Sequence, residues 1–120
     1  MKHLLPKLTQ RLRPLNEEAR QIVVPKFTLP VPQEDNNQIT HHWLWPRVGQ
    51  FFRKGDVIVA ETGTSSFGIL DVPLPGGSVF LAQILWGSIG WTVGSTLGAA
   101  IAARDIGLNR TILFVGDGSL

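Results

Sequence analysis

The last residues of the chain carry a pattern that suits a metal ion holding a diphosphate. An apolar run at residues 112–115 leads into the turn Gly116-Asp117-Gly118-Ser119. A carboxylate is a hard oxygen ligand for Mg²⁺ or Ca²⁺, and neighbouring glycines leave backbone N–H groups open to phosphate oxygens. A plain Asp-Gly turn that closes a strand has the same sequence. The motif by itself leaves both interpretations open.

Two other turns are built from small residues and follow predicted strands. Residues 62–66, with the sequence TGTSS, offer hydroxyl groups that can bind a polar ligand or cap the next helix. Residues 86–90, with the sequence WGSIG, open a predicted helix, and glycine there permits close approach of the backbone to a ligand. Open α/β sheets bind ligands beyond the carboxyl ends of their strands. We therefore expect the three turns to converge on one ligand site.

Other residues with suitable chemistry are interpreted as supporting groups. Glu61 is the only acid in the hydroxyl-rich turn, and we expect it to act as a hydrogen-bond partner behind the ligand contacts rather than as a general base. His41 and His42 are adjacent, so on a helix they point about 100° apart and do not readily share a ligand. We interpret this pair as an exposed helix start, and Trp43 and Trp45 as core or interface aromatics. The sequence shows no assembled Ser/His/Asp set and no Cys nucleophile.

The elements that must position these turns alternate between strands and helices. Apolar runs predict strands at residues 57–60, 79–82 and 111–115, and helical spacing predicts a helix at 88–104. Another helix is expected to begin at the capping residue Thr40. Gly55 is expected to end that helix in the left-handed conformation. Strands alternating with helices indicate an α/β fold, here a partial open parallel sheet with flanking helices.

The amino-terminal part of the chain is organised differently. Residues 1–20 are predicted as one helix with Pro6 and Pro14 at its ends. Residues 25–38 combine three prolines with a polar run, which is typical of an extended linker between domains. A helix and a linker are therefore expected to precede the α/β unit.

Two segments allow a second interpretation. Residues 1–15 are basic, leucine-rich and free of acids, which fits a mitochondrial presequence as well as a surface helix. Residues 79–103 carry no charge and contain Gly90, Gly94 and Gly98, which fits a membrane span with a small-residue face. In a soluble fold, the same glycine face would let a buried helix press closely on a sheet or another helix.

Composition and charge exclude other classes of function. Cysteine is absent, which excludes disulfides and zinc–thiolate sites. The net charge is +2, with nine Lys and Arg against four acids in residues 1–54 and two against five in residues 55–120. The basic residues are scattered and accompany no groove-reading motif, so we expect no nucleic-acid partner.

Three blocks of the sequence together resemble a known family. Residues 60–68 (AETGTSSFG), 85–90 (LWGSIG) and 112–120 (ILFVGDGSL) resemble the pyruvate decarboxylase family in its fungal form, one of the thiamine-diphosphate-dependent 2-oxo acid decarboxylases. The blocks stand in the family's order and spacing, and the resemblance covers the whole chain. It implies that residues 1–24 are the last helix of the central domain and that 25–38 are an interdomain linker. Residues 39–120 would be the first half of the diphosphate-binding domain, truncated after the Gly-Asp-Gly motif.

The resemblance also implies roles for individual residues. Asp117 would ligate Mg²⁺, and Gly118 and Ser119 would contact the diphosphate of thiamine diphosphate. Gly87 would offer its carbonyl to the aminopyrimidine, and Ile89 would wedge between the two rings and hold the cofactor bent. The cofactor-binding residues implied in this way are Thr64, Gly87, Ser88, Ile89, Gly118 and Ser119, with Thr62 as a neighbour of Thr64.

As a function, the resemblance implies non-oxidative decarboxylation of pyruvate to acetaldehyde and CO₂ by a cytoplasmic homo-oligomer, a dimer of dimers. It argues against the presequence and the membrane span. The family's catalytic glutamate, aspartate and two histidines belong to an amino-terminal domain, so none is assigned in this chain, which we expect to be an inactive fragment that folds poorly. A related enzyme acting on an aromatic 2-oxo acid, such as indolepyruvate or phenylpyruvate, and a non-catalytic module that associates with the parent enzyme are the alternatives.

Overall fold

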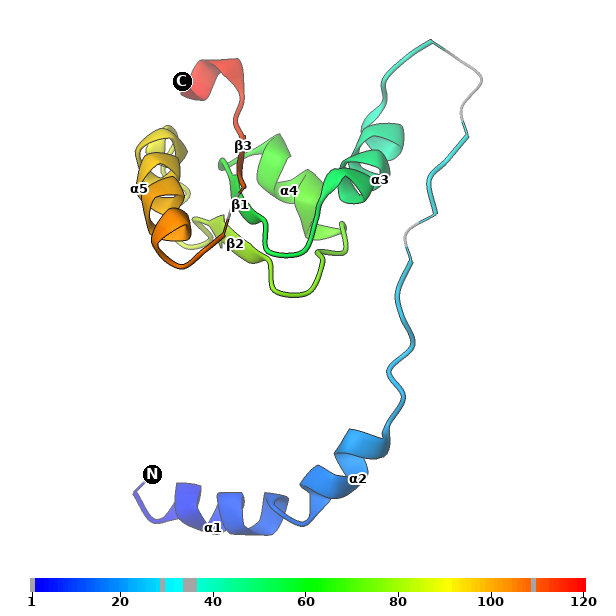
Figure 1. The fold of residues 1–120 in the computed structure, drawn as a ribbon, viewed down its shortest axis with the longest axis vertical. Coiled ribbons are helices and arrows are strands. Elements are labelled where there is room, and N and C mark those ends of the chain that lie inside the picture. The colour runs from blue at the N-terminus through cyan, green and yellow to red at the C-terminus, as the bar shows by residue number, and fades with distance from the viewer. Residues whose placement is uncertain (1, 29, 34–36, 109) are drawn as a thin grey trace.

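The computed structural model describes residues 2–28, 30–33, 37–108 and 110–120. Two helices come first, followed by a unit in which strands and helices alternate (Figure 1). In chain order the elements are α1 (Leu4–Leu12), α2 (Leu15–Gln21), α3 (His41–Phe51), β1 (Val57–Ala60), α4 (Thr64–Leu70), β2 (Val79–Ala82), α5 (Trp91–Asp105), β3 (Thr111–Phe114) and the short 3₁₀ helix η1 (Asp117–Ser119).

The three strands form one parallel sheet in the order β2-β1-β3. The central strand β1 is buried along its whole length, as its continuous apolar sequence predicts. Its last residue, Ala60, pairs with Ala82 of β2 and with Phe114 of β3, so all three strands end at the same edge. The predicted α/β class with a parallel open sheet and flanking helices is confirmed.

Helices cover both faces of the sheet. Figure 1 shows α5 on one side of the strands and α3 and α4 on the other. Side chains alternate along a strand, so Ile58 and Ala60 share one face of β1. That face belongs to the main core, a buried cluster formed by Phe52, Ile58, Ala60, Ile69 and Val72. The ring of Phe52 meets that of Phe114 edge-on, with centroids 5.9 Å apart.

An ion pair between a buried acid and a partly exposed arginine closes the opposite, amino edge of the sheet. Asp56 precedes β1 and is 2% exposed, and Arg110 precedes β3. The Arg110 guanidinium donates to both carboxylate oxygens of Asp56, at 2.8 and 2.6 Å, and Arg53 N donates to the same carboxylate at 2.7 Å. The hydrogen bonds from Arg110 lower the pKa of Asp56, whereas burial raises it. The hydrogen bond from Arg53 N and the positive charges of Arg110 and Arg53 lower it further, so the pKa of Asp56 lies below its ordinary value. No local sequence pattern predicts this pair, because its members lie 54 positions apart.

The capping predictions for α3 are partly confirmed. Thr40 Oγ1 accepts a hydrogen bond from Trp43 N at 3.2 Å, which is the expected cap. Gly55 has the expected left-handed conformation, with φ of +81°. However, α3 ends at Phe51, so Gly55 lies in the loop before β1 rather than directly after the last helical turn.

The prediction of a single helix at residues 1–20 is wrong in detail. Pro14 stands at the N-cap of α2 and separates it from α1, because its ring cannot continue a helix from within. Pro6 lies in the first turn of α1, where backbone N–H groups have no helical partner. Of the predicted linker, residues 25–28, 30–33 and 37–38 form neither helix nor strand, and residues 29 and 34–36 lie outside the described residues.

The glycine face of α5 points away from the sheet. Gly94 and Gly98 are exposed, and a Cβ added at either would meet no atom within 4 Å. Thr92 and Ala103 are the residues that α5 buries instead. The predicted close packing of the glycine face is therefore not found among the described residues. Within residues 2–28, 30–33, 37–108 and 110–120, no helix has the length and apolar character needed to cross a membrane.

Candidate functional site

The three small-residue turns meet at the carboxyl edge of the sheet, as predicted. One turn follows each strand, at residues 61–63, 83–90 and 115–119. A Cβ added at Gly87 would lie 3.5 Å from Thr62 Cγ2, and one added at Gly90 would lie 3.5 Å from the carbonyl oxygen of Ser119. The turn at residues 83–90 therefore lies beside both of the other turns. We call the residues of these three turns the carboxyl edge.

Glycine is required at two positions of this edge. Gly87 has φ of +57° and Gly90 has φ of +85°, a region that other residues rarely adopt. Gly90 is the N-cap of α5, so the chain enters that helix through a left-handed residue. The two glycines let the turn reverse sharply while its backbone stays close to Thr62 and Ser119.

Glu61 joins the elements that meet at this edge. It is 1% exposed, and its own N–H donates to Phe114 O at 2.9 Å, while its carbonyl oxygen accepts from Ser66 N at 3.2 Å. Its carboxylate accepts from Thr62 N at 2.9 Å and from the hydroxyl of Thr92. The side chain is thus engaged by the protein itself, in agreement with the predicted supporting role rather than that of a general base.

The protonation state of Glu61 follows from these contacts. Burial raises the pKa of Glu61, but hydrogen bonds from the Thr92 hydroxyl and from the backbone N–H groups of Thr62, Thr92 and Gly90 outweigh burial and leave the pKa below its ordinary value. Glu61 is therefore a carboxylate near neutral pH, and its negative charge lies at the N-terminus of α5, where the helix dipole favours it.

Acidification is expected to destabilise the fold. The pKa values of both Glu61 and Asp56 are lowered by folding, so their contributions are present above the unfolded-state pKa and are lost as the pH falls through the folded-state value. Urea unfolding monitored by circular dichroism should give a level midpoint between about pH 6 and 5 and a falling midpoint below about pH 4. A midpoint that stays level or rises below pH 4 would contradict the lowered pKa values of Asp56 and Glu61 in the folded state.

The residues predicted to hold Mg²⁺ and the diphosphate lie open at the edge. Asp117, Gly118 and Ser119 form η1, directly beyond β3, and Asp117 and Gly118 are exposed. A Cβ added at Gly118 would meet nothing within 4 Å, so its backbone is free for a ligand to approach. Thr64, also exposed, begins α4.

These donors fit a metal-bound diphosphate. Mg²⁺ takes one or two carboxylates together with phosphate oxygens and water, and Asp117 supplies one carboxylate. The Oγ1 atom of Thr62 is buried without a hydrogen-bond partner, so a polar group at the edge would satisfy it. Within the described ranges there is no cluster of three His, Cys, Asp or Glu that could hold a metal by protein ligands alone.

The turn before α5 holds the other predicted contacts. The backbone N–H of Ser88 donates to Oε1 of Gln83, the first residue of the same turn. Ile89 is 71% exposed, so its side chain is free to contact a ring system. Thr92 was missed by the sequence analysis. The only local signal is a threonine two residues after the glycine that opens a helix, and that signal does not reveal its distant partner.

The histidine pair lies outside this edge. His41 and His42 are exposed at the start of α3, as predicted. His41 Nδ1 accepts a hydrogen bond from Trp45 Nε1 at 3.2 Å, and the two rings stack with centroids 6.2 Å apart. Trp45 packs against the main core, whereas Trp43 carries the Arg47 guanidinium 4.3 Å from its ring centroid.

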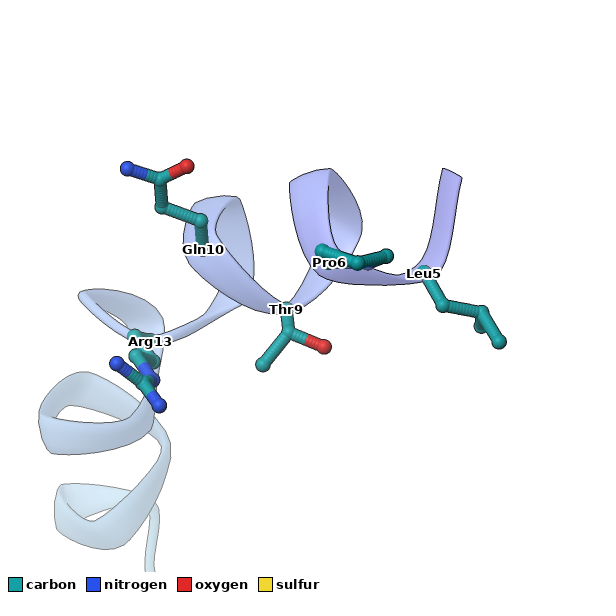
Figure 2. A pocket seen from close by; sticks show the side chains of 5 residues that line it. All are labelled: Leu5, Pro6, Thr9, Gln10 and Arg13. Carbon is teal, nitrogen blue, oxygen red and sulfur yellow. The ribbon is translucent and has the colours of Figure 1, made fainter. Parts of the chain in front are cut away.

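A hollow along α1 is not a candidate site. Figure 2 shows the five side chains that line it, all from α1 and the residue that ends it. They are Leu5, Pro6, Thr9, Gln10 and Arg13, and all five are exposed. Side chains from one helix cannot enclose a ligand, so the carboxyl edge remains the candidate.

Comparison with known proteins relates this edge to a family. No known family model matches the chain. Pyruvate decarboxylase of Aspergillus fumigatus is 43% identical over 124 residues, that of Candida albicans 46% over 123 residues, and isozyme 1 of Saccharomyces cerevisiae 43% over 124 residues, each alignment covering the whole chain. The chain is similar to one segment of pyruvate decarboxylase.

That segment is short compared with the relatives. The chain spans 21% of the pyruvate decarboxylase of Aspergillus fumigatus and 22% of the other two. The resemblance to fungal pyruvate decarboxylase, expected from three sequence blocks, is confirmed over the whole length of the chain. The matched region includes the three turns of the carboxyl edge.

Proposed function

We propose that the carboxyl edge binds the diphosphate and Mg²⁺ of thiamine diphosphate, and that the chain is a fragment of a pyruvate decarboxylase. The observation that supports this most is the convergence of three turns at one edge, where a Cβ added at Gly87 would meet Thr62 and one added at Gly90 would meet the carbonyl oxygen of Ser119. Open α/β sheets bind ligands at such an edge. The relatives named pyruvate decarboxylase match the chain through all three turns.

Each residue at the edge has a proposed task. Asp117 ligates Mg²⁺, and the exposed N–H of Gly118 and the hydroxyl of Ser119 contact the diphosphate. Thr64 and Ser88 add polar contacts, and Gly87 and Ile89 orient the two rings. When bound, thiamine diphosphate supplies the electron sink for loss of CO₂ from a 2-oxo acid. The residues of this chain hold and orient it.

The proposal extends to the whole enzyme. Its substrate is pyruvate, its products are acetaldehyde and CO₂, and it works in the cytoplasm as a dimer of dimers. The 120-residue chain alone has no decarboxylase activity, because one carboxylate at an open edge does not enclose a metal site.

A segment exchange tests this function. We expect a Saccharomyces cerevisiae isozyme 1 whose matching segment is replaced by this chain to decarboxylate pyruvate with thiamine diphosphate and Mg²⁺. Asp117→Asn in that chimera should lower kcat/KM by about 100-fold or more, since even residues behind metal ligands contribute 10- to 100-fold. Acetaldehyde release is measured by coupled reduction with NADH.

Two controls define the outcome. Asp105→Asn changes an exposed aspartate far from the edge and should leave the activity of the chimera unchanged. The isolated chain, titrated calorimetrically with thiamine diphosphate and Mg²⁺, should show no micromolar binding. A folded chimera without activity would refute the proposed function. Micromolar binding of thiamine diphosphate by the isolated chain would refute the claim that its cofactor site is incomplete.

A further inference from the structure

The first turn of α5 is contacted by a side chain that lies far away in the sequence. Its N-cap, Gly90, has no side chain, so the helix cannot cap itself in the usual way. The carboxylate of Glu61, 31 residues before Thr92, lies there instead. Both side chains are buried, Glu61 at 1% and Thr92 at 0% exposed.

The donors around this carboxylate favour an anion. Two hydrogen bonds reach it, from the hydroxyl of Thr92 and from the backbone N–H of Thr62. The backbone N–H groups of Gly90 and Thr92, at the start of α5, add to the lowering of its pKa. A carboxylate is acceptor-only, whereas a glutamine amide has one acceptor oxygen and would turn its NH₂ donors toward donors of the protein. The surroundings of Glu61 therefore form a built anion site, filled by the protein's own side chain.

We propose that Glu61 is a positioning residue of the carboxyl edge. By occupying the anion site at the N-terminus of α5, its carboxylate holds the turn at residues 87–90 against the ends of β1 and β3. This positioning does not depend on the function proposed above.

Amide hydrogen exchange in the chimera described above, without thiamine diphosphate, tests the positioning. We expect Glu61→Gln to speed exchange at Gly90 and Thr92 at least tenfold while β1 (Val57–Ala60) remains protected. Glu17→Gln, on exposed α2, should change neither region. Unchanged exchange at Gly90 and Thr92 in Glu61→Gln would overturn the proposal.

A matched pair on α5 covers the case in which Glu61→Gln unfolds the chain. Thr92→Val removes one donor to the carboxylate and should speed exchange at Gly90 severalfold. Thr96→Val removes a buried hydroxyl that has no partner and should leave this exchange unchanged. Equal effects of the two substitutions would overturn the proposal, because they would show that the threonines act only by packing.

Chemical rescue separates charge from shape. In Glu61→Ala, acetate should restore part of the lost protection at Gly90 and Thr92, and chloride at the same ionic strength should not. Equal responses to the two salts would contradict the anion site. These measurements contain no thiamine diphosphate, so their failure is distinct from failure of the chimera to decarboxylate pyruvate.

Discussion

Replacing Asp56 by alanine lowers the free energy of unfolding by about 2–4 kcal/mol, somewhat less than the roughly 3–5 kcal/mol for breaking a fully buried ion pair. The substitution removes a carboxylate that is 2% exposed and leaves the Arg110 guanidinium with only the carbonyl of Phe51 as acceptor among its described contacts. The expected loss of stability is smaller than for a fully buried pair because the Arg110 side chain is 27% exposed and water can solvate part of it. Urea unfolding at neutral pH, monitored by circular dichroism, measures the change.

Asp105→Ala is the matched control for this prediction. Asp105 also pairs with an arginine, Arg104, but at 3.8 Å and with both side chains largely exposed. Exposed pairs of this kind contribute little. We expect no resolvable change in the urea midpoint. Equal effects of the two substitutions would show that the Asp56–Arg110 pair stabilises the fold no more than an exposed ion pair does.

Gly68→Ala is expected to destabilise the chain by about 1–3 kcal/mol through overpacking. A Cβ at this position of α4 would lie 1.9 Å from Cε2 of Trp45 and 2.3 Å from two other atoms of the indole. The indole cannot move away freely, because it is hydrogen-bonded to His41 and packs on the main core. Either α4 or Trp45 must shift, and the urea midpoint should fall.

Gly94→Ala, in α5, is the control that should act in the opposite direction. An added Cβ there meets no atom within 4 Å, and alanine is a better helix former than glycine. The free energy of unfolding should rise by about 0.5–1 kcal/mol. A loss of stability would show that another surface packs closely on the glycine face of α5, as the sequence first suggested.

Much of the fold was predictable from local patterns. The apolar run of β1, the Thr40 cap and the small-residue turns each depend on residues within a few positions of one another. The order of strands and helices predicted a parallel sheet, and a parallel sheet brings its turns to one edge. The candidate site was predictable for the same reason.

Most of the exceptions involve contacts between distant residues. The glycines of α5 were expected to face a neighbour, yet the helix buries Thr92 and Ala103 instead. Sequence spacing predicts that residues share a face, but only packing decides which face meets the sheet. The division of residues 1–20 into two helices at Pro14 was missed for a local reason, since proline is tolerated at a first turn and disruptive within a helix.

By itself, the sequence determined the class of fold, the three turns and their relation to pyruvate decarboxylase, because these follow from local chemistry and from matching blocks. Only the tertiary structure decided the partners of the two buried acids. Asp56 meets Arg110 across 54 positions and Glu61 meets Thr92 across 31. Both pairings depend on the strand order β2-β1-β3 and on the placement of α5 against β1 and β3, and no periodicity within a segment encodes that arrangement.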